Sequence, residues 1–225
     1  MKDKLNKASQ LKKIQDNYFV RMMLPDAEER AELYVKEEKE ALLKLMTSIP
    51  GIDKMNFVII GSGTIWYIEL AYDKTKTYVA VEPLANIFIQ RQFNYILSKH
   101  KNIKIIDKEF GDFTAIEIPN NNSIFVFHFN ILAYIPNPIR NINKYLKEGD
   151  ILYISSWNNS DEAKQVRKTY FDYLNLNTDS NSFKINPEET VGLCNLDIFP
   201  FHKLKYYKRH ERIKGKITDI LIIYC

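Results

Sequence analysis

From residue 56 onward, short apolar runs alternate with longer segments of helical periodicity. The apolar runs predict strands at 57–60, 77–81, 103–106, 123–127 and 151–155. The helical segments between them are 65–72, 84–98, 138–146 and 160–174. Because the strands are apolar at nearly every position, both faces of the sheet should be covered, as in a parallel sheet with helices on each side. The pattern therefore predicts a doubly wound α/β core.

Both ends of the chain depart from this alternation. Apolar residues recur at helical spacing before the core, on a face that comprises Ala31, Tyr34, Val35, Ala41, Leu42 and Leu45. The runs 203–213 and 216–224 are strand-like, and the turn at Lys214-Gly215 is too short for a parallel crossover. We therefore expect an N-terminal helical cap over 1–50 and a Rossmann-like domain over 51–225. Its mostly parallel seven-stranded sheet should end in an antiparallel hairpin.

Composition limits the class of protein. A chain of 225 residues, 45% of them hydrophobic, is long enough to bury one substantial core. Its first fifteen residues contain no apolar h-region, and no run reaches the length of about 18 apolar residues that a membrane span needs. Cys194 and Cys225 form no CxxC pair. We expect a soluble cytoplasmic protein without a membrane partner, and the sequence leaves its oligomeric state open.

The net charge of +4 is concentrated in one segment. Residues 200–216 contain seven Lys or Arg and the single acid Glu211. Such a run could face phosphates. Its alternation with Leu204 and Tyr206 favours the solvated face of a surface hairpin, so a nucleic-acid partner is not expected.

The first predicted strand ends in the turn Gly61-Ser62-Gly63. Glycines there let a ligand approach the backbone at a helix start. A dinucleotide fingerprint would need glycine at position 66, where Trp66 stands. Glu82 ends the second strand, about twenty residues later, where a carboxylate can accept both hydroxyls of a ribose. A plain tight turn and a solvated acid are the alternatives.

A polar turn also follows the third predicted strand, in the segment KEFGDF. The carboxylate of Asp112 can accept from an exocyclic amine, and the N–H of Phe113 can donate to a ring nitrogen. The pair therefore suits an adenine edge, although Gly-Asp is also a common turn.

Four segments together resemble the class I S-adenosylmethionine-dependent methyltransferases. FVIIGSGT resembles their glycine-rich first motif, VAVEP their acidic second motif and FGDF their adenine-side motif. The stretch SIFVFHFNILAYIPNPIRNINKYLKEGDILYISSW resembles the family's fourth strand, turn, helix and fifth strand. The resemblance covers about residues 56–157. It implies that S-adenosylmethionine is held, without a metal, by Gly61, Ser62, Gly63, Glu82, Pro83, Asp112, Phe113 and Asn130.

Departures from the family pattern leave the transferred group open. Ile59 stands where the family usually has an acid, and Ile65 stands at its third glycine. The IGSG loop also resembles nicotianamine-synthase-like enzymes, which transfer the aminocarboxypropyl arm of the same cofactor. We expect a methyltransferase that acts on a small molecule at nitrogen or oxygen and releases S-adenosylhomocysteine. The alternatives are aminocarboxypropyl transfer, a cyclisation, or a non-catalytic module that contacts RNA through the basic hairpin.

Residues for the acceptor are predicted from their positions alone. His128, at the end of the fourth strand, is a candidate base, and Tyr134 a second catalytic candidate. Tyr18 and Trp157 are candidate substrate contacts, because aromatic faces favour cationic groups. The polar segment 175–200, together with the N-terminal helices, is expected to form a lid over the acceptor pocket.

Overall fold

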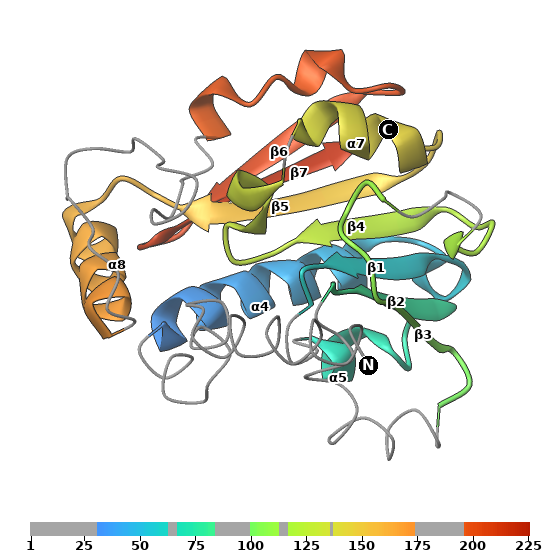
Figure 1. The fold of residues 1–225 in the computed structure, drawn as a ribbon, viewed down its shortest axis with the longest axis horizontal. Helices are drawn as coiled ribbons and strands as arrows, with labels where there is room; N and C mark the ends of the chain where they lie inside the picture. The colour runs from blue at the N-terminus through green and yellow to red at the C-terminus, as the bar shows by residue number, and fades with distance from the viewer. Residues whose placement is uncertain (1–30, 63–66, 84–99, 113–116, 136, 174–195) are drawn as a thin grey trace, which may run out of the picture.

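A seven-stranded sheet forms the centre of the computed structural model, which describes residues 31–62, 67–83, 100–112, 117–135, 137–173 and 196–225. The strands lie in the order β3-β2-β1-β4-β5-β7-β6 (Figure 1). Their bounds are β1 Asn56–Ile60, β2 Thr77–Val81, β3 Ile103–Ile106, β4 Ser123–Phe127, β5 Ile151–Trp157, β6 Arg209–Lys214 and β7 Thr218–Tyr224. β1 to β5 pair in parallel, and β7 pairs antiparallel with both β5 and β6. The predicted fold class is thereby confirmed.

The last hairpin differs from its prediction in one respect. The strand expected over 203–213 begins only at Arg209, and the preceding chain forms the short 3-10 helix η5 (Phe201–Lys203). Pro200 has no N–H to donate to a sheet, and Tyr206 adopts a positive φ of 62° that a strand does not accommodate. Leu204 is buried against the core instead. Residues 203–208 therefore do not belong to the sheet.

Helices cover both faces of the sheet. On one side lie α4 (Glu32–Ser48) and α5 (Ile68–Ala71), and on the other lies α7 (Pro138–Tyr145) (Figure 1). α8 (Asp161–Tyr173) follows β5 at the end where the parallel strands terminate. Short 3-10 helices complete the described elements: η1 Ile52–Lys54, η3 Ile131–Tyr134 and η4 Leu196–Ile198. The helix predicted over 84–98 and the helices before residue 31 lie outside the described residues.

Buried side chains form a core on each face of the sheet. The first core packs Ala41, Leu42 and Leu45 of α4 against the strands, as the periodicity of that segment predicts. The second core includes Ile142 and Tyr145 of α7. Both cores consist of apolar and aromatic side chains. The buried polar and charged side chains lie outside these two clusters. No helix among the described residues combines the length and the apolar character needed to span a membrane.

Candidate functional site

The glycine turn follows β1 directly and is tightly packed. Gly61 has a positive φ of 65°, and its N–H donates to the carbonyl of Val81, 2.8 Å away. A Cβ at this position would lie 2.6 Å from Cγ1 of Ile131. Glycine is therefore required at position 61 for two reasons, which are the positive φ of the backbone and the close approach of η3.

Two buried polar side chains lie beside this turn. β1 and β2 pair with Ile60 opposite Val81, so Gly61 and Glu82 leave the sheet side by side. Glu82 is only 3% exposed, and Ser62 is completely buried. The Ser62 hydroxyl has no hydrogen-bond partner among the described residues. A buried hydroxyl without a partner indicates a position where a ligand's polar group would satisfy it.

The turn after β3 is anchored to α7. Phe110 packs edge-on against Phe127, with ring centroids 5.3 Å apart. Gly111 has a φ of 114° and lies close against the side chain of Asn141. Asp112 is exposed, while Phe113 lies outside the described residues. Burial, followed by the charge of Asp112, raises the pKa of Tyr145 to about 12, so the Asp112 carboxylate lies near that ring.

The end of β4 is tied to the glycine turn by His128. Its Nε2 lies 2.8 Å from the Gly61 carbonyl oxygen, and burial lowers the pKa of the imidazole to about 4. The ring is therefore neutral near pH 7 and donates Nε2–H to that carbonyl. Phe129 and Asn130 follow, with positive φ angles of 45° and 62°. Asn130 donates its N–H to the Ser155 carbonyl and is almost fully buried.

A buried carboxylate on α4 joins these strand ends, and the sequence prediction missed it. Glu38 is fully buried and accepts the N–H of Phe129 at 2.8 Å and the hydroxyls of Tyr67 and Ser155. Burial raises its pKa to about 7, against the opposing effect of these hydrogen bonds. Its signal in the sequence is an acid inside the apolar stripe from Ala31 to Leu45.

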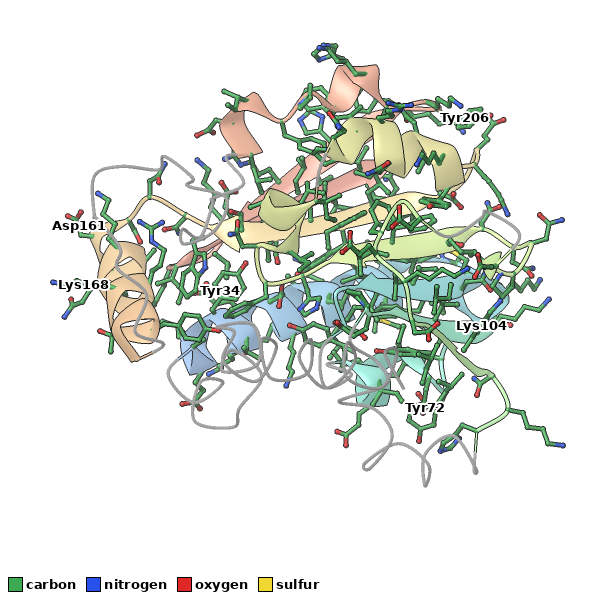
Figure 2. The ribbon with its side chains drawn as sticks, viewed as in Figure 1. Tyr34, Tyr72, Lys104, Asp161, Lys168 and Tyr206 are labelled. Atoms are coloured by element: carbon green, nitrogen blue, oxygen red, sulfur yellow. The ribbon has the colours of Figure 1, made fainter. Side chains whose placement is uncertain are left out.

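Trp157 ends β5 inside an aromatic cluster. Its ring centroid lies 4.4 Å from that of Tyr34 and 5.8 Å from that of Phe129. Tyr170 of α8 completes the cluster, and Tyr34 lies at the end of α4 that is nearer to α8 (Figure 2). Trp157 is only 4% exposed. The Trp157 ring is therefore enclosed by the other aromatic side chains of this cluster.

The predicted residues therefore fall into three groups. Around adjoining strand ends the structure places Gly61, Ser62, Glu82, Pro83, His128 and Asn130. Asp112 and Trp157 lie at the neighbouring ends of β3 and β5. Tyr18, Gly63, Phe113 and the side chain of Tyr134 lie outside the described residues. Within the described part of the chain, no three His, Cys, Asp or Glu side chains are grouped to hold a metal ion.

Comparison with solved structures identifies the fold. The N-methyltransferase NodS from Bradyrhizobium japonicum WM9, in complex with S-adenosyl-L-homocysteine, has a TM-score of 0.53 and 14% identity. That match covers 91% of this chain and 95% of NodS. A structure from Methanococcus maripaludis, described as an S-adenosyl-L-methionine-dependent methyltransferase, has a TM-score of 0.55 and 16% identity over 92% of this chain and 94% of that chain. The CurJ carbon methyltransferase has a TM-score of 0.54 and 10% identity, over 86% and 54% of the two chains. The chain thus has the class I methyltransferase fold.

Sequence comparison adds little. No protein-family model matches the chain. It is 25% identical over 194 residues to pH-responsive protein 1 of Candida albicans, a match that covers 84% of this chain. The chain spans about a third of the length of that protein (33%). This identity does not assign a family.

Proposed function

We propose that the protein is an S-adenosylmethionine-dependent methyltransferase that methylates a small molecule at nitrogen or oxygen. One observation carries the proposal. The glycine turn, the buried carboxyl of Glu82 and the Ser62 hydroxyl, which has no hydrogen-bond partner among the described residues, meet at the carboxyl ends of β1 and β2. Ligands of doubly wound sheets bind at such ends. The methyltransferase fold and the N-methyltransferase NodS among its structural neighbours support the same class of reaction.

The residues present fit the cofactor in a definite order. Glu82 would accept the ribose hydroxyls, with Pro83 beside it, and Ser62 would bond a polar group above the turn. Asp112 and Phe113 would take the adenine edge, and Asn130 would lie near the amino-acid end. The bound cofactor supplies an activated methyl group together with its own leaving group. No metal is needed in this scheme.

The tasks of the chain are then to orient the acceptor and to exclude water. The Nε2–H of His128 donates to the Gly61 carbonyl. This hydrogen bond would hold the glycine turn in place beside the cofactor. The predicted action of His128 as a base, and the predicted catalytic part of Tyr134, remain proposals. So do the acceptor contacts assigned to Tyr18 and Trp157, the lid formed by the N-terminal helices and 175–200, and a cytoplasmic location.

Calorimetric titration with S-adenosylmethionine and S-adenosylhomocysteine tests the cofactor assignment. Glu82→Ala should weaken binding of both by about tenfold to a hundredfold, because a ribose would lose a charged acceptor. Asp107 offers a matched control, since it follows β3 as Glu82 follows β2 but is exposed. Asp107→Ala should bind normally. Unchanged affinity in Glu82→Ala would remove the ribose assignment, and no binding by the unmodified protein would remove the proposed function.

Product analysis separates methyl transfer from the other reactions on this cofactor. Methyl transfer leaves S-adenosylhomocysteine, whereas aminocarboxypropyl transfer leaves methylthioadenosine. The altered first motif, with Ile59 in place of an acid, is the observation that favours testing the second reaction. Mass spectrometry of the nucleoside product, after incubation with a panel of small amines and alcohols, would distinguish them. Methylthioadenosine as the sole product would refute methyl transfer.

A further inference from the structure

Two basic segments far apart in the sequence contain no acidic residue at all. The first, 137–147, carries Arg140, Lys144 and Lys147. The second, 199–210, carries Lys203, Lys205, Lys208 and Arg209. Either segment alone would be interpreted as a solvated surface. In the folded chain, however, the two segments lie against each other.

The structure joins these two segments along α7. The Asn143 side chain donates to the Lys203 carbonyl at 3.1 Å and accepts the N–H of Lys205 at 2.8 Å. This pairing is possible because 203–208 lie outside the sheet. It produces an open groove of about 710 Å³ whose walls carry Arg140, Lys144, Lys203 and Lys205. No carboxylate of the described residues lines the groove.

The charges in this groove are largely unneutralised. Outside it, Lys208 pairs with Glu148 and Arg209 with Glu211. Inside it, Lys144 donates to the Gly111 carbonyl, a neutral group. Neither Arg140 nor Lys203 nor Lys205 forms an ion pair or side-chain hydrogen bond with any residue that the structure describes. Such a concentration of positive charge raises the local density of anions.

Exposed apolar side chains accompany the charges. Tyr206 is 50% exposed and lies within 199–210, the segment that forms one wall of the groove, and Ile198, which directly precedes this segment, is 77% exposed. In the described part of the chain, Leu43 is the only other exposed large apolar side chain, and it is exposed by only 38%. Tyr206 lies at the surface, on the opposite side of the sheet from Tyr34 (Figure 2). Its exposed ring can therefore stack on a planar group of a ligand.

We propose that this groove binds the phosphodiester backbone of single-stranded RNA, with Tyr206 stacking on a base. Lysines act as point charges toward phosphates, whereas carboxylates of an acidic protein are better matched by paired arginines, and only Arg140 is present in the groove. Basic grooves with an exposed aromatic ring are typical of single-strand binding. None of the residues predicted to hold the cofactor lines this groove, so the inference is independent of the proposed function.

Fluorescence anisotropy with a labelled oligouridylate of about twelve nucleotides tests the inference. The full chain should bind it, with log affinity falling linearly with log salt between about 50 and 300 mM. The triple variant Arg140→Ala, Lys203→Ala, Lys205→Ala should bind at least about tenfold more weakly. It should also lower the slope by about 2, or about 0.7 for each phosphate that is no longer neutralised. Tyr206→Ala should weaken binding at every salt concentration without changing the slope.

A triple variant elsewhere provides the matched control. Lys36, Lys54 and Lys168 are exposed lysines on other elements, so replacing all three with alanine removes the same charge without touching the groove. It should leave the slope almost unchanged. In the unmodified chain, bound RNA should also protect Lys203 and Lys205 from chemical acetylation, a readout that needs no variant. Absence of binding at low salt, equal losses in both triple variants, or equally tight binding of oligoglutamate would each overturn the proposal.

Discussion

Two neighbouring glutamates of α4 hold two different regions of the molecule. Glu37 is partly exposed and accepts the backbone N–H groups of Lys216, Ile217 and Thr218 and the Thr218 hydroxyl, from the turn after β6 to the start of β7. Glu38 is fully buried and accepts one backbone N–H and two hydroxyls at the strand ends. One helix thus fastens the edge of the sheet and the candidate site through adjacent residues.

The difference between the two regions lies in their access to water. Around Glu37 water can reach part of the released hydrogen-bonding groups, because Glu37 is partly exposed and Lys216 is exposed, whereas Ile217 and Thr218 are buried. Around Glu38 water cannot, so the same loss of an acceptor leaves buried donors unsatisfied. We infer that the strand-end region tolerates change least, and that the start of β7 with its turn tolerates it somewhat better. Substitutions in the two regions should therefore differ in their cost to stability.

Removing the buried carboxylate should give the largest effect. Glu38→Ala should lower the free energy of unfolding by about 4 kcal/mol, since three donors lose their acceptor at about 1–3 kcal/mol each. Glu37→Ala should cost about 2 kcal/mol, because water can replace the carboxylate at the exposed Lys216 but less well at the buried Ile217 and Thr218. Urea unfolding of both variants at pH 6 measures the two values. Equal losses in the two variants would contradict the contrast.

Ionisation of Glu38 should make stability depend on pH. Its folded pKa of about 7 lies above the ordinary value of 4.5, so its contribution is present below pH 4.5 and is lost as the pH rises through 7. Burial holds the pKa of the facing Tyr67 and Tyr153 well above the usual range, so both stay neutral. Between pH 5 and 8 the wild type should lose about 3 kcal/mol relative to Glu38→Gln.

Subtracting the variant's profile removes the contributions of other groups. Asp150, with a pKa raised to about 6 by burial, and His128, with a pKa lowered to about 4, remain in both proteins. Thermal unfolding at each pH, followed by circular dichroism, gives the curves. Parallel curves for wild type and Glu38→Gln would show that the buried carboxyl does not titrate in this range.

Two glycines with similar backbone angles extend the contrast. Gly61 and Gly51 have φ angles of 65° and 74°, but only Gly61 is enclosed, since a Cβ on Gly51 would meet nothing within 4 Å. Gly51→Ala should cost about 1 kcal/mol for its left-handed conformation. Gly61→Ala should cost about 3 kcal/mol, because Ile131 must also move. Calorimetry should further show weaker binding of S-adenosylhomocysteine in Gly61→Ala alone.

The sequence predicted this fold well, because its signals are local. Apolar runs marked the five parallel strands, and the short link at Gly215 required the antiparallel hairpin. The sequence prediction was wrong for the segment 203–208. Its alternating residues suggested a strand, but its backbone forms hydrogen bonds with the Asn143 side chain of α7. That contact joins positions about sixty residues apart, which no periodicity indicates.

The candidate site was predictable only where it follows strand ends. Glu82 and His128 could be placed from their position after apolar runs. Glu38 could not, since its partners Phe129 and Ser155 come from distant segments and only the fold brings them together. The groove arises in the same way. Tertiary packing thus supplies both features that the motifs did not indicate.

The smallest expected effect on stability is also the most informative about the ligand. Ser62→Ala removes a buried hydroxyl that has no hydrogen-bond partner among the described residues, so the free energy of unfolding should change by less than about 1 kcal/mol. Binding of S-adenosylhomocysteine should nevertheless weaken about fivefold to tenfold, because the hydroxyl would bond the ligand. Glu38→Gln should show the reverse pattern, with stability altered more than affinity. A Ser62→Ala protein that loses stability and keeps its affinity would show that the hydroxyl serves the fold, and the cofactor role proposed for Ser62 would then be wrong.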